Sequence, residues 1–337
     1  MRFRFVALAT ACVLSAVACS GTGGATTTGV DPGTNATVAP TTLAPTTAAP
    51  STTAPFDGTF TGADGVTTEI GDTSRIVSLT GDITEIIFSL GLGDQVVAVD
   101  ITTTFPPDAE RLKADGGNVG FGQALNAEAV LRYEPTLVIG DETIEPAETI
   151  EQLRNAGVPV VILPYQTTLD GVGTKIGSVA RILGVEEEGQ ALTEEVMAEI
   201  AAAQQAADEA GSEPRVVFLY IRGPSLLFVF GADLPTNAMI EGAGAIDAGA
   251  ELGTGPITVT PEALIAAAPD VIVLPESGLE SLGGFDALLE IPGVAETPAG
   301  RNRAFLAYEE AYFFNLGPRA GQALAEFVAD LYAIIAG

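Results

Sequence analysis

A short helix followed by a proline turn and a buried strand occurs twice in this chain. In the first half the pattern reads Ala-Glu-Ala-Val-Leu from Ala127 and continues as Pro-Thr-Leu-Val-Ile from Pro135. In the second half it reads Pro-Glu-Ala-Leu-Ile from Pro261 and continues as Pro-Asp-Val-Ile-Val from Pro269. The internal spacing is the same, and glutamate, alanine and proline match in register. The pattern therefore indicates duplication of one α/β lobe.

Short apolar runs alternate with helical segments around both copies of this pattern. Such alternation predicts parallel sheets with helices on both faces. The expected strands are 76–79, 96–99, 137–139, 158–163, 215–219 and 271–273. After a turn at 80–82, a helix is expected through 86–90, and further expected helices are 127–133, 147–155 and 261–265.

A long helix is predicted between the two halves. Residues 186–210 are rich in Ala, Glu and Gln, and the segment after Gln190 has no glycine or proline, so the helix should be roughly 30–35 Å long. The expected fold is α/β, with two similar Rossmann-like lobes (69–185 and 213–337) joined by a single long helix (186–212). A ligand cleft would lie between the lobes. Because a helix permits less closure than hinge strands do, we expect this cleft to be largely pre-formed.

The first residues have the features of an export signal. Basic residues precede an apolar stretch that is too short to span a bilayer, which predicts a signal peptide over 1–18. Small residues lead into Cys19, as in a bacterial lipobox; ordinary cleavage after Ala-Val-Ala is the alternative. Residues 19–68 are dominated by Thr, Ala, Pro and Gly, which predicts a disordered tether. We therefore expect an extracytoplasmic protein that is anchored to the cell membrane by a lipid on Cys19.

The composition excludes several classes of site. The 337 residues include no histidine, and both cysteines lie in the first twenty residues, so His-based metal sites, imidazole triads and cysteine nucleophiles are excluded from the folded part. The net charge is −30, from 44 acidic and 14 basic side chains, and such a surface repels nucleic acid.

Local motifs give a family resemblance over residues 72–337. The motifs are R-I-V-S-L-x-G-x-x-T-E-I at 75–86, L-N-A-E-A-V-L at 125–131, E-x-L-R-N-A-G-V-P-V-V at 151–161, F-G-A-D at 230–233 and P-A-G-R-N at 298–302. On these motifs the chain is similar to the helix-linked (class III) substrate-binding lipoproteins of ABC importers, and most similar to their hemin-binding members.

The resemblance implies partners and a docking role for the duplicated glutamates. An ABC permease and its ATPase would be the partners of a monomeric receptor. In this class one glutamate on each lobe meets arginines of the permease, and the matching residues are Glu128 and Glu262. The distance between two like charges, one on each lobe, depends on the lobe separation. A basic permease surface could therefore distinguish one lobe separation from another. The alternative is that each is a first-turn glutamate favoured by the helix dipole.

A tyrosine and an arginine end the first strand of the second half. Tyr220 and Arg222 are two residues apart, so in an extended strand both should project into the cleft. A phenolate oxygen suits Fe(III), and the guanidinium is expected to lower the pKa of the phenol. The Tyr-x-Arg pair resembles the iron-ligating pair of hemin-binding relatives. The alternative is a half-buried strand tyrosine whose hydroxyl is bonded to Arg222.

The other lobe departs from the pattern of the hemin-binding relatives. Phe121 stands where they have a tyrosine or histidine, and a phenyl ring can stack on a porphyrin but cannot bind iron. Haem would then be five-coordinate through Tyr220, or Tyr165, Tyr308 or Tyr312 would supply a second ligand. Further candidates for contacts with a flat apolar guest or its carboxylates are Phe105, Phe228, Phe230, Phe313, Phe314 and Arg319.

The expected function is capture of a tetrapyrrole, with hemin as transported ligand and no catalysis. Cobalamin is the main alternative because the same fold carries it and it needs no iron ligand. A catecholate siderophore would call for more basic side chains than the chain has. An anchored α/β enzyme would need an acid–base set, and the pairs at 141–142 and 309–310 are interpreted as solvated loop charges. An adhesion or structural lipoprotein is also compatible with the tether.

Overall fold

The computed structural model describes residues 58–223 and 226–337, which all belong to one unit, Ala54–Gly337. The predicted signal peptide, Cys19 and most of the predicted tether lie outside the described residues. Among the helices of the described part, none is both long and apolar enough to cross a bilayer.

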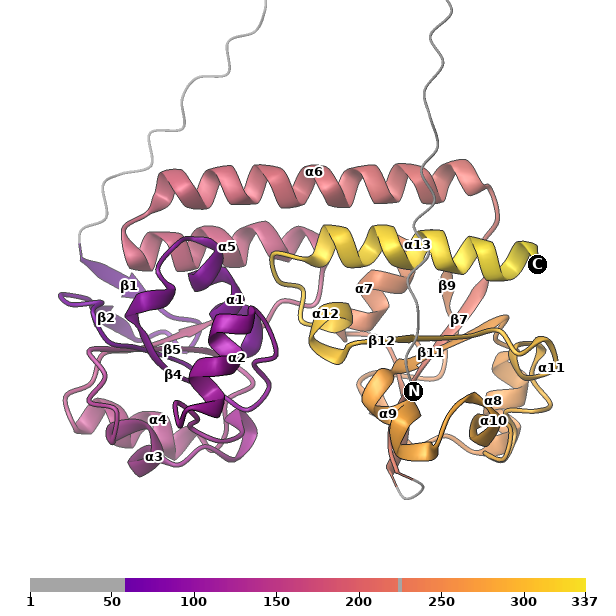
Figure 1. The fold of residues 1–337 in the computed structure, drawn as a ribbon, viewed down its shortest axis with the longest axis horizontal. Helices are drawn as coiled ribbons and strands as arrows, with labels where there is room; N and C mark the ends of the chain where they lie inside the picture. Colours follow the sequence, from indigo (N-terminus) through magenta and orange to yellow (C-terminus); the bar gives the residue numbers. More distant parts are fainter. Residues whose placement is uncertain (1–57, 224–225) are drawn as a thin grey trace, which may run out of the picture. The chain divides into compact units, whose positions relative to one another are not determined.

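The N-terminal lobe is built on a parallel sheet, as predicted (Figure 1). Its strands, in spatial order, are β4 (Val96–Val99), β3 (Ile76–Ser78), β5 (Leu137–Asp141) and β6 (Val160–Leu163). Every residue of β3, β5 and β6 is buried, as expected for strands covered on both faces.

Helices cover both faces of this sheet. Alternate strand residues enter different clusters: Ile76 and Ile139 pack on the face of α1 and α5, whereas Val77 and Val138 pack on the face of α3 and α4. The helices of this lobe are α1 (Gly81–Ser89), α2 (Pro107–Ala114), α3 (Ala127–Leu131), α4 (Ala147–Asn155) and α5 (Leu169–Leu183), with 3₁₀ turns η1 (Gly93–Gln95) and η2 (Gly122–Ala124).

The C-terminal lobe has a mixed sheet, where only parallel pairing was predicted. Its strands, in spatial order, are β10 (Pro256–Ile257), β8 (Leu226–Phe230), β7 (Arg215–Arg222), β11 (Val271–Pro275) and β12 (Phe305–Tyr308), and β9 (Ile246–Asp247) also pairs with β7. β7, β9, β11 and β12 are parallel, but β8 runs antiparallel to β7 and β10 antiparallel to β8. Gly223, the residue after β7, has a φ of 63° that favours glycine.

The duplicated pattern occupies the same place in both lobes. Helix α3 leads into β5, which lies beside the first strand of its sheet, β3; in the C-terminal lobe a helix at Pro261–Ala267, α8, leads into β11, which lies beside β7. The other helices of this lobe are α7 (Pro235–Gly242), α9 (Glu276–Leu282), α10 (Phe285–Leu288), α11 (Pro298–Asn302), α12 (Glu310–Phe314) and α13 (Ala320–Ala336).

Helix α6 (Glu186–Ala210) joins the lobes, as predicted from its composition. It runs along α5 of one lobe and α13 of the other (Figure 1). The contacts are close: a Cβ placed on Gly189 of α6 would lie 2.1 Å from Cβ of Ala180 in α5. A Cβ on Gly321 of α13 would lie 2.4 Å from Cβ of Glu199 in α6.

The predicted end of the tether is wrong, because the N-terminal lobe begins by residue 58 and not at 69. A hairpin of β1 (Thr59–Thr61) and β2 (Thr67–Glu69) packs on the lobe. The Thr68 hydroxyl donates to the carbonyl oxygen of Val160 at 2.9 Å, and Ala63 N–H donates to that of Ile162 at 2.7 Å. The threonine-rich composition of the tether continues into this hairpin, so composition alone could not mark the boundary.

Replacing Gly321 with alanine should destabilise the protein by about 1–3 kcal/mol, because the new methyl group would overlap Glu199 of α6. Gly177→Ala in α5 is the matched control. A Cβ there has no neighbour within 4 Å, so this change should be neutral or stabilise by up to about 1 kcal/mol. Urea denaturation measures both, and equal effects of the two substitutions would contradict the close packing of α6 and α13.

Candidate functional site

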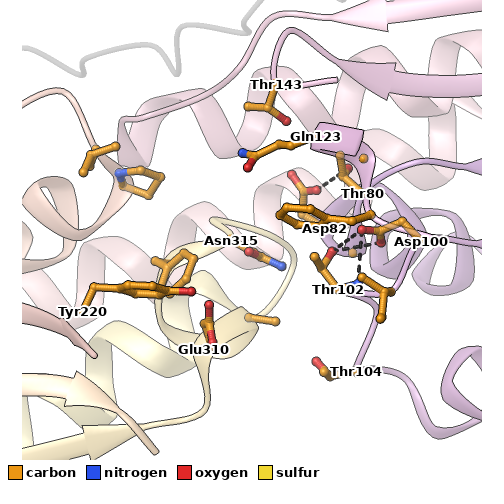
Figure 2. Close-up of a pocket in the computed structure, with 18 of the residues that line it drawn as sticks. Thr80, Asp82, Asp100, Thr102, Thr104, Gln123, Thr143, Tyr220, Glu310 and Asn315 are labelled. Atoms are coloured by element: carbon orange, nitrogen blue, oxygen red, sulfur yellow. Dashed lines mark hydrogen bonds between the residues drawn. The ribbon is translucent and has the colours of Figure 1, made fainter. Parts of the chain in front are cut away.

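A cavity of about 890 Å³ lies between the lobes, at the carboxyl ends of the strands of both sheets (Figure 2). The N-terminal lobe contributes the residues that follow β3, β4, β5 and β6, and the C-terminal lobe contributes those at the ends of β7, β11 and β12. This is where open α/β sheets bind ligands.

The wall from the C-terminal lobe is aromatic. The Tyr220 ring stacks on the Phe230 ring, with centroids 5.1 Å apart and an interplanar angle of 10°. Phe228 pairs with Tyr220 across the β7–β8 hairpin, and Phe314 meets Phe230 edge-on at 6.3 Å. All four line the cavity and offer a surface for a flat apolar guest.

Tyr220 and Arg222 project together, as predicted from their spacing. The Arg222 guanidinium carbon lies 5.0 Å from the centroid of the Tyr220 ring. Arg222 donates to the carboxylate of Glu310 and to the hydroxyl of Ser277. In Figure 2 the Tyr220 hydroxyl points toward Glu310.

The predicted lowering of the Tyr220 pKa is wrong for this arrangement. Burial raises the pKa of Tyr220, and the negative charge of Glu310 raises it further, whereas Arg222 lowers it only in part. Glu310 was interpreted as a solvated loop charge, but it is half-buried and pairs with Arg222. Glu309 accepts from the backbone N–H groups of Ala311 and Tyr312 and so caps α12.

The wall from the N-terminal lobe is polar and acidic. Asp82, Asp100 and Asp141 line the cavity and are only 6%, 2% and 5% exposed. Each accepts a hydrogen bond from a threonine two residues away: Thr80 at 2.6 Å, Thr102 at 2.7 Å and Thr143 at 2.5 Å. Asp141 is therefore not the solvated loop charge that was predicted, although Glu142 is exposed.

Burial changes the ionisation of this wall. It raises the pKa of Asp100 to about 6, although hydrogen bonds from Thr102 and Thr103 lower it. Burial also raises the pKa of Asp141, and the charge of nearby Asp82 adds to that effect. The carboxylates of this wall were not among the predicted ligand-binding residues. Their sequence signal is an Asp-x-Thr motif at the carboxyl ends of β4 and β5, at 100–102 and 141–143.

Phe121 and Tyr165 face the cavity from the N-terminal lobe. Phe121 is 45% exposed, so its ring is available to a ligand. Tyr165 also lines the cavity, but burial and the charges of Asp141 and Asp82 raise its pKa, which disfavours a phenolate there.

The remaining predicted tyrosines lie outside the cavity lining. Tyr308 is buried in the core of the C-terminal lobe, where its ring stacks on Phe313 at 5.0 Å and its hydroxyl donates to Asp330 at 2.9 Å. Tyr312 lines a smaller depression of about 300 Å³ with Phe105, Thr104, Glu309 and Arg319. Tyr308 and Phe313 are therefore core residues.

The arginines expected to meet ligand carboxylates already have carboxylate partners. Arg319 donates through Nε and Nη2 to Glu85 at 2.9 and 3.0 Å, and it lies 3.9 Å from the centroid of the Phe105 ring. Arg222 is paired with Glu310. Neither offers an unpaired positive charge to a propionate.

Glu128 and Glu262 occupy the same position in the duplicated helices. Each is exposed at the second residue of its helix, behind the N-cap residue Asn126 or Thr260. Within the described residues neither carboxylate has an ion-pair or hydrogen-bond partner. α3 and α8 pack on the sheet faces opposite to the one that α6 covers (Figure 1).

Known proteins share this architecture. The periplasmic binding protein family matches residues 76–312. The chain belongs to that family. Among solved structures it is similar to the periplasmic heme-binding protein RhuT from Roseiflexus sp. RS-1, with 46% identity, a TM-score of 0.75 and coverage of 78% of this chain and 99% of that one. Heme binding protein HmuT is 37% identical, with a TM-score of 0.75 and coverage of 81% and 89%.

Curated relatives include an ABC-transporter lipoprotein whose name gives no ligand and a vitamin B12-binding protein. The ABC transporter substrate-binding lipoprotein YvrC of Bacillus subtilis is 26% identical over 264 residues, which span 77% of this chain and 81% of YvrC. The vitamin B12-binding protein of Vibrio campbellii is 29% identical over 170 residues, which span 50% of this chain and 58% of that protein. This family member is thus an extracytoplasmic substrate-binding protein of the ABC-transporter type and not an enzyme.

The protein should be more stable at pH 5 than at pH 7.5. The folded-state pKa of Asp100, about 6, lies above the unfolded value of about 3.9, so stability is lost as the pH rises through this window. About 1.4 kcal/mol of stability should be lost between pH 5 and pH 7.5, because the folded-state pKa lies about one unit above pH 5. Urea denaturation at both pH values should show a smaller pH dependence for Asp100→Asn and an unchanged one for exposed Asp208→Asn. An unchanged pH dependence in Asp100→Asn would contradict this assignment.

Proposed function

We propose that this protein captures hemin in the inter-lobe cavity, with Tyr220 as the iron ligand, and delivers it to an ABC permease. The observation that carries the proposal is the Tyr220–Arg222 pair, which lies at the carboxyl end of β7 in an aromatic wall of a cavity of about 890 Å³. A phenolate oxygen is a hard donor that suits Fe(III).

The neighbouring structures support the same assignment. Solved variants of HmuT replace a tyrosine, the arginine two residues after it, and a histidine. That histidine precedes its tyrosine by as many residues as Phe121 precedes Tyr220 here. Tyr220 and Arg222 thus match in type and spacing, and Phe121 would replace a possible ligand with a stacking ring.

Tyr220 is the best-placed iron ligand of the cavity. Tyr308 is buried in the core, and Tyr312 lines the separate depression of about 300 Å³. Burial raises the pKa of both Tyr165 and Tyr220. Arg222 offsets part of this effect and of the Glu310 charge at Tyr220, whereas Asp141 and Asp82 raise the pKa of Tyr165 further. With Phe121 opposite, the expected complex is five-coordinate. Since Arg222 and Arg319 are already paired, hemin propionates would point away from the acidic N-terminal wall and toward solvent.

Cobalamin is the second candidate, and the acidic wall favours it. The corrin ring carries neutral amide groups, which can donate hydrogen bonds to Asp82, Asp100 and Asp141 without charge repulsion. Relatives named for vitamin B12 or cobalamin binding occur among the curated proteins.

Delivery of hemin to the permease would depend on Glu128 and Glu262. Attachment of the protein to the membrane would depend on Cys19. The two exposed carboxylates, one per lobe, suit a permease surface that carries arginines. A lipid on Cys19 would keep the receptor at the membrane, close to the permease.

Hemin should bind one-to-one, with a saturable Soret shift and a phenolate-to-iron charge-transfer band. Tyr220→Phe should abolish that band and weaken hemin binding by at least about tenfold, about 1.4 kcal/mol, while Tyr165→Phe should leave both unchanged. Metal-free protoporphyrin IX is the control ligand, and its affinity should be alike in wild type and Tyr220→Phe.

Two outcomes of this titration would contradict the proposal. A charge-transfer band that persists in Tyr220→Phe would place the ligand elsewhere. Absence of any saturable shift would exclude hemin, and cobalamin should then be titrated against the same protein.

Replacing both docking glutamates should uncouple binding from transport. We expect Glu128→Ala/Glu262→Ala to bind hemin like wild type but to lower uptake by the cognate permease in proteoliposomes at least about tenfold. Glu148→Ala is the matched control, since Glu148 is an exposed first-turn glutamate of α4. Uptake at the wild-type rate by the double variant would mean that the two glutamates only stabilise their own helices through the helix dipole.

A further inference from the structure

The two lobes touch at a short junction at the base of the cavity. The segment Asn315–Arg319 of the C-terminal lobe lies against the first turns of α1 in the N-terminal lobe. A Cβ on Gly81 would lie 3.2 Å from Nδ2 of Asn315, and a Cβ on Gly317 would lie 3.6 Å from Cβ of Asp82. These distances show that the segment is in van der Waals contact with the first turn of α1.

A buried lysine spans this junction. Lys175 of α5 is 4% exposed, and its ammonium group donates to the carboxylate of Asp82 in α1. It also donates to the carbonyl oxygens of Asn315 at 3.2 Å and Leu316 at 3.3 Å, which belong to the other lobe. Leu316 has a φ of 47°, an unusual conformation for leucine, in the segment where two successive carbonyls bond the same ammonium group.

A second charged pair crosses the junction beside the first. Glu85 accepts the two hydrogen bonds from Arg319, and Glu85 follows Asp82 by three residues, so both carboxylates lie on one side of α1. The Glu85 side chain is 7% exposed and that of Asp82 also 7%, so salt screens these pairs only weakly.

Lys175 is not part of the cavity lining, but two of the residues it holds are. Asp82 lines the cavity from one lobe and Asn315 lines it from the other (Figure 2). A single ammonium group therefore bonds to both walls of the cavity at its base.

We propose that Lys175 is a positioning residue that fixes the separation of the two lobes and so pre-forms the ligand cavity. The effect of Lys175 on hemin capture and permease docking rests on the proposed function. The effect of Lys175 on the lobe separation does not. With the lobes held at one separation, Tyr220 and Phe121 face the same ligand, and Glu128 and Glu262 keep one spacing.

The test measures the lobe separation without any ligand. Spin labels are attached to Glu148→Cys in α4 and Ala266→Cys in α8, both exposed, in a full chain with Cys12→Ser and Cys19→Ser. Double electron–electron resonance then gives the distance distribution for wild type, Lys175→Met and Asp82→Asn/Lys175→Met. The matched control is Arg111→Met, which breaks an exposed pair with Asp108.

Wild type and Arg111→Met should give one narrow distance, and both Lys175 variants a distribution at least twice as wide. If Lys175→Met does not fold, the distance is measured in the double variant alone, because Asp82→Asn/Lys175→Met leaves no unpaired buried charge. A distribution as narrow as wild type in a folded variant would overturn the proposal. Loss of folding in both variants would also overturn it, since Lys175 would then serve folding and not lobe spacing. Failure of hemin binding would leave this result intact and would refute only the proposed function.

Discussion

The close packing of α6 against α5 and α13 is the constraint on which the rest of the structure depends. Each lobe buries one sheet face in a core shared with this helix layer, and glycines at 189 and 321 let the helix axes approach closely. The sheets therefore present the carboxyl ends of their strands to one another. The cavity, its aromatic wall and its acidic wall are consequences of this arrangement, and Lys175 and Arg319 join the lobes at its base.

The cavity is chemically asymmetric, and this asymmetry limits how a ligand can lie in it. The C-terminal wall offers aromatic rings and a tyrosine hydroxyl, whereas the N-terminal wall offers buried carboxylates and threonine hydroxyls. An anionic edge of a ligand would be repelled by Asp100 and Asp141. A flat tetrapyrrole that stacks on Phe230 and Phe314 can avoid that repulsion by turning its carboxylates to solvent.

Sequence patterns predicted the parts of this protein that repeat or that follow a period. The duplicated helix–strand unit, the helix at 186–210, and the common direction of Tyr220 and Arg222 are confirmed by the structure. The β7–β8 hairpin and the partners of the charges were not predicted, because they depend on residues far apart in the chain. Glu310 meets Arg222 across 88 residues, and burial of Tyr220 together with the charge of Glu310 reverses the expected pKa shift of Tyr220.

Anomalous diffraction at the iron edge, from crystals grown with hemin, tests the central claim most directly. The account predicts one iron peak within bonding distance of the Tyr220 hydroxyl oxygen, with the porphyrin between Phe121 and the aromatic wall. An iron peak against the carboxylates of the N-terminal wall, or at Tyr165, would contradict it. So would crystals whose cavity holds no iron at hemin concentrations that saturate the protein in solution.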